Sequence, residues 1–352
     1  MIPVLPFAAL RAALPALFAA AMACTPAPAM ARDAGASPGE AKLPVVATFS
    51  LLADIVAQVG GDRVLVSSLV PPGGDMHVFE PGPSHARQLA QAGLVVGNGL
   101  GFEGWIDRLV RSSGYGGPVL LASRGIEPLH DAQEAGDDRH AHGGRRGKEP
   151  DHAGHPARDR DAGTQHAGGV DPHAWQSVPN MKRYVENIAD GLCERQPAGC
   201  GDFRVNAGRY AARLDQLDRD IRGLLAPIPG ERRKVITSHR AFGYYAREYG
   251  VTFLAPAGLG TGVEPSAAAV GRLIRQIREQ KVNAFFVEGI SDSRLIDRIR
   301  AETGGATSGT LYSDSLSAPE GPAASYEAMM RFNTEAITAA LSAPPATPAA
   351  RR

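Results

Sequence analysis

The chain has 352 residues, of which 43% are hydrophobic and 21% are charged, and its formal net charge is zero. This composition is typical of a soluble globular protein, and the length allows one large domain or two domains of ordinary size. A balanced charge provides neither a basic surface for nucleic acid nor an electrostatic attraction to membranes, so we expect neither partner.

The first 31 residues differ from the rest and are typical of a secretory signal peptide. Arg11 precedes an apolar run over residues 12–23, and the small-x-small triplet at 29–31 predicts cleavage after Ala31. The apolar run is shorter than the ~20 residues that a transmembrane helix needs. We therefore expect a soluble exported protein. The alternative is a lipoprotein anchored at Cys24, and the intact mass of the mature protein distinguishes the two.

Export also determines the expected state of the cysteines. Cys193 and Cys200 remain after removal of the signal peptide, and they are separated by the segment ERQPAG. An even number of cysteines in an oxidising compartment predicts one disulfide, and the Pro and Gly allow a small loop to close. Two unpaired buried thiols are the alternative, which a thiol titration under denaturing conditions tests.

From Leu43 onward, β-like runs alternate with amphipathic segments. In the first half we expect strands at 43–49, 64–70, 94–97 and 119–122, with helices at 51–60, 83–93 and 102–114. In the second half we expect strands at 234–238, 251–254 and 282–287, with helices at 240–250, 265–279 and 293–304. Strands that alternate with helices predict an α/β fold with two lobes, each containing a parallel sheet.

A charged, strongly periodic segment lies between the two lobes. Residues 203–225 place apolar side chains at Tyr210, Leu214, Leu217 and Ile221, which is helical spacing, and we expect one long helix that joins the lobes. A shorter helix-like segment, 180–192, precedes it. The predicted organisation is a signal peptide at 1–31, an N-terminal lobe at 43–200, a linking helix at 202–226, a C-terminal lobe at 231–343 and a disordered tail at 344–352.

Residues 130–169 are rich in His, Asp, Arg and Gly and contain almost no large apolar side chains. Such a segment buries too little surface to offset its ordering entropy, so we expect a mobile loop. It either collects metal weakly and passes it inward or is a solvated insertion with little effect. Its candidate auxiliary metal ligands are His140, His142, His152, His155 and His166.

Three of the histidines outside this loop are candidate metal ligands. His77, in GGDMHVFEPGP, and His239, in VITSHRAFGYY, each follow an expected strand, and His173 lies in VDPHAW. In open α/β sheets, ligands bind at the carboxyl ends of strands. Three converging imidazoles favour a borderline-soft divalent cation. Asp314, in YSDSLS, is the candidate fourth ligand, with Glu288 as the alternative; His85, in a helix first turn, is expected to be structural.

Several motifs are similar to those of one known family. The segment GGDMHVFEPGPSHARQLAQAGLVVGNGLGFEGWIDRL resembles the N-terminal lobe of the periplasmic metal-binding proteins of zinc and manganese ABC importers, the ZnuA-type family. DPHAW, SHRAFGYYAREYG, GVEPS and YSDSLS resemble later motifs of that family in the same order, and the likeness runs from about Leu43 to Leu341. Met76 departs from members with an acidic ligand directly before the histidine, and QSVPN departs from the frequent L-D-P-x-N.

This resemblance implies both an architecture and a site. The architecture is two (β/α) lobes with parallel sheets, joined by one long rigid helix, with the metal site in the cleft between the lobes. The implied ligands are His77, His173, His239 and Asp314. Members resembling manganese binders tend to carry a carboxylate at the third position, where this chain has His239, so we expect Zn²⁺.

The resemblance also implies a role in transport rather than catalysis. We expect a periplasmic, monomeric solute-binding protein that captures Zn²⁺ and delivers it to the membrane permease of an ABC transporter, with a periplasmic metal chaperone as a further candidate partner. The alternatives are a manganese-binding member of the family, an adhesin on the same scaffold, or a zinc-dependent hydrolase with Glu288 as base. The sequence contains no H-E-x-x-H pair, which argues against the hydrolase.

Overall fold

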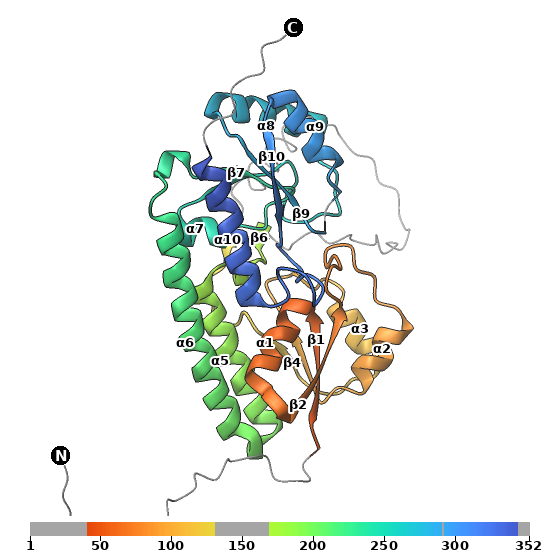
Figure 1. Cartoon of the computed structure of the whole chain (residues 1–352). Helices are drawn as coiled ribbons and strands as arrows, with labels where there is room; N and C mark the ends of the chain where they lie inside the picture. The colour runs from red at the N-terminus through yellow and green to blue at the C-terminus, as the bar shows by residue number, and fades with distance from the viewer. Residues whose placement is uncertain (1–40, 131–168, 291, 344–352) are drawn as a thin grey trace, which may run out of the picture. The chain divides into compact units, whose positions relative to one another are not determined.

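A computed structural model describes residues 41–130, 169–290 and 292–343, and this part of the chain has a mixed α/β fold (Figure 1). The predicted signal peptide, Cys24, the C-terminal tail and the five candidate auxiliary histidines lie outside the described residues. Among the described residues, no helix is both long enough and apolar enough to span a membrane.

The first lobe contains four parallel strands in the order β2-β1-β3-β4. The strands are β1 (Leu43–Phe49), β2 (Val64–Val70), β3 (Leu94–Gly97) and β4 (Val119–Leu121), and the helices are α1 (Ser50–Gly60), α2 (Pro83–Ala90) and α3 (Ile106–Ser113). Helix α1 buries Leu51, Leu52, Ile55 and Val56 against β1 and β2. This spacing is a helical apolar stripe, and burying each such side chain stabilises the fold by about 1.5–3 kcal/mol.

The second lobe repeats the strand order of the first. Its parallel sheet has the order β10-β9-β7-β8, so in both sheets the first strand of the lobe lies between its second and third. Its elements are β7 (Lys234–Ile236), α7 (Gly243–Tyr249), β8 (Thr252–Leu254), α8 (Ala267–Gln280), β9 (Ala284–Glu288), α9 (Arg294–Thr303), β10 (Ala306–Leu311) and α10 (Tyr326–Ser342). In such sheets the order in which strands are added reverses between the first and third strands, and ligands bind at this point, at the carboxyl ends of the strands.

One long helix, α6 (Cys200–Leu225), connects the lobes, and a second long helix, α5 (Val178–Arg195), precedes it and packs on the first lobe. Helix α6 packs against α1 and α5 in its N-terminal part and against α10 and α7 further along its length (Figure 1). The buried side chains of α6 include Tyr210, Leu214 and Leu217, as its periodicity predicts. The disulfide between Cys193 and Cys200, which the sequence predicted, joins the last turn of α5 to the start of α6.

Two local features differ from the sequence expectations. Helix α3 begins at Ile106 rather than near 102. Positive φ at Gly99, Leu100 and Gly101 forms a turn. The Glu103 carboxylate accepts the N–H groups of Asn98 and Gly99, which holds the residues just before the helix in this turn. The chain also forms a short antiparallel pair between β5 (Leu129–His130) and β6 (Val170–Asp171), which the sequence did not suggest.

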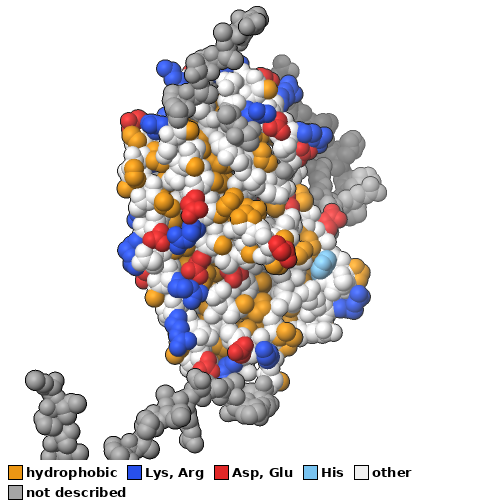
Figure 2. All heavy atoms as spheres, in the orientation of Figure 1, with side chains coloured by type: hydrophobic (Ala, Val, Ile, Leu, Met, Phe, Trp, Pro, Cys, Tyr) orange, Lys and Arg blue, Asp and Glu red, His pale blue; other side chains and the backbone are white. Residues whose placement is uncertain are grey.

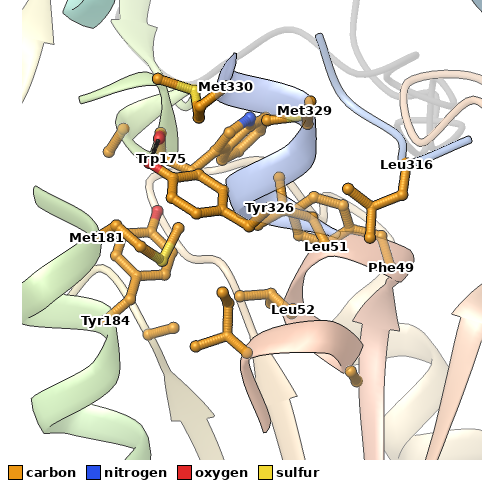
Figure 3. Packing of buried hydrophobic residues seen from close by; sticks show 14 of the residues in the cluster. Phe49, Leu51, Leu52, Trp175, Met181, Tyr184, Leu316, Tyr326, Met329 and Met330 are labelled. Atoms are coloured by element: carbon orange, nitrogen blue, oxygen red, sulfur yellow. Dashed lines mark hydrogen bonds between the residues drawn. The ribbon is translucent and has the colours of Figure 1, made fainter. Parts of the chain in front are cut away.

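The main hydrophobic core is shared by the two lobes. Figure 3 shows Phe49 and Leu51 of the first lobe packed with Trp175 and with Tyr326 and Met329 of α10. The Tyr326 hydroxyl also donates a hydrogen bond to the Trp175 carbonyl at 2.8 Å. A second apolar cluster lies within the second lobe, under α8 and α9. Because one core extends across both lobes, movement of one lobe relative to the other disturbs buried packing.

The face shown in Figure 2 carries Lys and Arg side chains interspersed with Asp and Glu. This mixing agrees with the zero formal net charge of the whole sequence. The charged groups on this face are therefore arranged as an ordinary solvated surface and not as a field of one sign.

Candidate metal centre

Four side chains from separate parts of the sequence converge on one point. His77 follows β2, His173 follows β6, His239 follows β7 and Asp314 follows β10, and one ligand atom from each lies within 4.8 Å of every other. All four side chains are buried, with relative exposures between 0% and 5%. The structure therefore brings together the three histidines and the aspartate that the sequence selected, at the edge where the two sheets meet.

The geometry of the group suits a small cation at its centre. The Nε2 atoms of His77, His173 and His239 lie 3.2, 3.5 and 3.0 Å from carboxylate oxygens of Asp314. Bonds of about 2.0–2.1 Å to a tetrahedral zinc ion place neighbouring ligand atoms roughly 3.3 Å apart. The centroids of the three imidazole rings are 5.3–5.5 Å from one another, so the rings surround the point evenly.

Two of the histidines are presented by the same local turn. In Asp75-Met76-His77 and in Asp171-Pro172-His173, the aspartate Oδ1 accepts a hydrogen bond from the histidine backbone N–H, at 2.8 and 2.9 Å. This is the Asx-turn chemistry that Asp favours in loops. Asp75 also accepts a 2.6 Å hydrogen bond from the Thr261 hydroxyl, which ties the His77 loop to the second lobe.

Two carboxylates lie behind the imidazoles. Asp171 Oδ1 is 2.7 Å from Nδ1 of His173, and Glu288 Oε2 is 2.7 Å from Nδ1 of His239. Carboxylates in this position orient metal-binding histidines and increase their basicity. Glu288 was the alternative candidate for the fourth ligand, but its carboxylate lies behind His239, because β9 pairs with β7, the strand that His239 follows. The position of Asp171 two residues before His173 is typical of a turn, but it does not indicate the contact between the Asp171 carboxylate and Nδ1 of His173.

Asp314 belongs to the second lobe, yet its loop is held by hydrogen bonds from side-chain and backbone groups of the first lobe. The Ser313 carbonyl accepts hydrogen bonds from Trp175 Nε1 at 2.9 Å and from Gln176 Nε2 at 2.8 Å. The Ser315 hydroxyl accepts a 2.7 Å hydrogen bond from the Gly73 N–H, in the loop that carries His77. These contacts fix the carboxylate relative to His77 and His173.

The electrostatics of the site favour a positive charge at its centre. Burial opposes charge on His239, but Glu288 and Asp314 outweigh it and raise the pKa of this imidazole well above 6.5. Burial would raise the pKa of Asp314, but His239 and His173 hold it well below 3.8. Burial lowers the pKa of His77, although Asp314 partly opposes the shift. Asp314 is therefore an anion at neutral pH.

Several buried polar atoms of this group have no aligned hydrogen-bond partner among the described residues. They are Nε2 of His173, Nε2 of His239 and Oδ1 of Asp314. Buried polar atoms are nearly always satisfied, and a cation bound by all three would satisfy them together. Phe102 and Trp175 lie edge-on to His77 and His173, each with ring centroids 5.2 Å apart, and this apolar wall strengthens charge interactions within the site.

The fourth histidine outside the predicted loop has a different role. Nδ1 of His85 accepts a 2.8 Å hydrogen bond from the Gly82 N–H at the start of α2. It satisfies a backbone donor where the helix begins, which is a capping interaction. His85 therefore provides a histidine outside the metal centre for use as a control.

The chain is similar to known proteins over most of its length. A family described as "zinc-uptake complex component A, periplasmic" matches residues 45–340. The iron-binding protein YfeA of Yersinia pestis is 30% identical over 298 residues, which cover 84% of this chain and 85% of that protein. The manganese ABC transporter substrate-binding lipoprotein PsaA of Streptococcus pneumoniae is 28% identical over 307 residues, which cover 86% of this chain and 89% of that protein.

Solved structures with the same architecture are also known. The cadmium-bound periplasmic metal binding protein from Candidatus Liberibacter asiaticus superimposes with a TM-score of 0.70 at 25% identity, covering 85% of this chain and 100% of that one. The periplasmic zinc binding protein TroA from Treponema pallidum gives a TM-score of 0.73 at 24% identity, covering 86% of this chain and 100% of that one. At this identity the likeness to TroA concerns the fold.

Proposed function

This chain belongs to the family of periplasmic zinc-uptake components, and from that premise we propose that it captures Zn²⁺ in the periplasm and delivers it to an ABC permease. Members of the family are metal-binding proteins of transporters and not enzymes, so this chain is a transport protein and the hydrolase alternative is excluded. The relatives are named for iron, manganese and zinc, and the choice of zinc rests on the residues of this chain.

The third histidine supports zinc. Nε2 of His239 lies 3.0 Å from Asp314, so the group offers three imidazole nitrogens and one carboxylate. This set suits tetrahedral zinc, whereas Mn²⁺ favours oxygen ligands and a higher coordination number. A carboxylate lies behind His173 and another lies behind His239, and both make the imidazole nitrogens stronger electron-pair donors to a metal. Stronger nitrogen donors favour Zn²⁺ over Mn²⁺.

A competition titration tests the proposed metal. The metal-stripped protein is titrated with Zn²⁺, Mn²⁺ or Fe²⁺ against a chromogenic chelator of known affinity. We expect one Zn²⁺ per chain and tighter binding of Zn²⁺ than of Mn²⁺ or Fe²⁺. Because divalent ions differ in intrinsic affinity, the Zn²⁺ to Mn²⁺ ratio is compared with that of the free chelator. A ratio no larger than the chelator's, or tighter binding of Mn²⁺, contradicts the assignment.

The burial of the site supports capture followed by controlled release. The four side chains are 0–5% exposed, so a bound ion cannot leave without movement of a surrounding loop. Helix α6 and the shared core connect the two lobes, and we infer that this movement is small. In the proposed cycle the loaded protein docks on the permease, and docking opens the site.

The metal-induced stabilisation is expected to increase as pH rises from about 5.5 to about 8.5. The pKa of His239 is raised in the folded protein, so protonation of this imidazole stabilises the metal-free fold at pH values below 6.5. This contribution to stability is lost as pH rises through the pKa of the folded state. Zn²⁺ must displace that proton, so binding improves over the same window. The depressed pKa of Asp314 keeps it ionised throughout. Melting temperatures with and without Zn²⁺ across this range measure the effect, and a constant difference contradicts it.

A further inference from the structure

The two carboxylates behind the imidazoles hold their histidines in different ways. Glu288 uses both oxygens: Oε1 accepts the backbone N–H groups of Ser238 and His239 at 2.8 and 2.9 Å, and Oε2 faces Nδ1 of His239 at 2.7 Å. Asp171 uses one oxygen for two tasks, because its Oδ1 meets both the backbone N–H and Nδ1 of His173, at 2.9 and 2.7 Å. Its other oxygen faces Gly243.

We propose that Glu288 is a positioning residue that holds His239 in the tautomer with the proton on Nδ1, so that Nε2 presents a lone pair to the metal. This inference rests on the proposed function, since it concerns the same metal centre. Nδ1 of His239 and Oε2 of Glu288 have no aligned hydrogen-bond partner elsewhere among the described residues, so each is the available partner of the other. An ionised carboxylate can accept a hydrogen bond from the Nδ1–H group but cannot donate one to Nδ1.

The arrangement around Glu288 makes one isosteric change informative. In Glu288→Gln, the two backbone donors require the amide oxygen at the Oε1 position, because an NH₂ group there would face two N–H groups. The amide NH₂ must then face Nδ1 of His239 and donate to it. This arrangement favours the opposite tautomer, with the proton on Nε2, where it blocks the metal.

Asp171→Asn is the matched control. It removes the same unit of negative charge from the same distance behind a proposed ligand. The amide oxygen at the Oδ1 position still accepts from the backbone and from Nδ1 of His173, while the NH₂ takes the position that faces Gly243. The tautomer of His173 is therefore preserved, and the two variants separate loss of charge from loss of tautomer.

The experiment is a chelator-competition titration with Zn²⁺ on five proteins. They are the wild type, Glu288→Gln, Asp171→Asn, His239→Ala and the double variant His239→Ala/Glu288→Gln. Outer carboxylates typically contribute 10–100-fold to metal affinity, so we expect a loss of about 100-fold in Glu288→Gln and under about tenfold in Asp171→Asn. In the His239→Ala background, Glu288→Gln is expected to have little further effect. Melting temperatures of the metal-free variants verify folding.

Nitrogen NMR of ¹⁵N-histidine-labelled protein reads the tautomer directly. In Zn²⁺-loaded wild type, we expect a protonated Nδ1 and a metal-bound Nε2 at His239, and in Glu288→Gln we expect this Nδ1 proton signal to disappear. Equal affinity losses in Glu288→Gln and Asp171→Asn, or a protonated Nδ1 at His239 in Glu288→Gln, would overturn the inference. A wild type that binds no Zn²⁺ would instead overturn the proposed function, and the comparison would then use whichever ion binds.

Discussion

Replacement of His173 with Ala is expected to weaken Zn²⁺ binding by at least about 100-fold and to remove most of the thermal stabilisation that Zn²⁺ gives the wild type. His173 is fully buried, its Nε2 lies 3.5 Å from Asp314, and Asp171 orients its ring from behind. A cation placed in the variant would lose one of four ligands in a site that has little access to replacement water.

The linkage between binding and folding sets the size of the effect. A ligand present at 1,000 times its dissociation constant stabilises the fold by about 4.1 kcal/mol, and a 100-fold weaker site leaves roughly 1.4 kcal/mol at the same concentration. Unfolding is followed by calorimetry with and without Zn²⁺. The quantity compared between proteins is the change in melting temperature that Zn²⁺ causes, because the variant also leaves the Asp171 carboxylate without its imidazole partner and so lowers the stability of the metal-free protein.

His85→Ala serves as the control for this experiment. It removes a histidine that caps α2 and lies outside the four converging side chains, so the Zn²⁺-induced shift should stay as in the wild type. If His173→Ala kept the full shift, or if His85→Ala lost it, the metal would have to bind elsewhere in the protein.

The double variant His239→Glu/Glu288→Gln is expected to lower the ratio of Zn²⁺ to Mn²⁺ affinity by at least about tenfold. A carboxylate at position 239 exchanges a nitrogen donor for oxygen, which favours Mn²⁺ over Zn²⁺. Glu288 lies 2.7 Å from the present imidazole, so His239→Glu alone would place two carboxylates in contact and raise the pKa of one of them. A glutamine at 288, held by the backbone N–H groups of Ser238 and His239, would donate its NH₂ to the new carboxylate.

The selectivity measurement includes both single variants as references. Chelator-competition titrations with Zn²⁺ and Mn²⁺ give the affinity ratio for each protein. We expect Glu288→Gln alone to weaken binding of both ions and the double variant to recover Mn²⁺ binding relative to it. An unchanged ratio in the double variant would show that His239 does not determine the choice of metal.

The sequence predicted the secondary structure well where apolar patterns are continuous. The strands 43–49, 64–70 and 94–97 match β1, β2 and β3, because the runs of a parallel sheet are largely apolar and therefore easy to recognise. Predictions were less accurate where local backbone conformation decides. Helix α3 starts later than expected because the Glu103 carboxylate binds the backbone N–H groups of Asn98 and Gly99 in the turn before it. The β5-β6 pair joins residues 40 and 42 positions apart, and no local pattern indicates this pairing.

The candidate site was predicted in part. The positions of His77 and His239 after expected strands indicated the carboxyl edge of a sheet. His173 and Asp314 were also candidates from the residues, and the family resemblance implied all four as ligands. The roles of Asp171 and Glu288 depend on which oxygen faces which nitrogen, and no sequence pattern contains that information.

The sequence alone determined the alternation of strands and helices, the disulfide between Cys193 and Cys200 and the identity of the four converging side chains. The first depends on local periodicity, and the cysteines and histidines are residue types that are few in the chain, while Asp314 was selected by its place in a motif after the last β-like run. The tertiary structure alone decided that the first lobe holds the Asp314 loop and that Glu288 stands behind His239 instead of beside it. The first result depends on hydrogen bonds from Trp175 and Gln176, which are far from Ser313 in sequence. The second follows from the order of strands in the second sheet, which brings β9 next to β7.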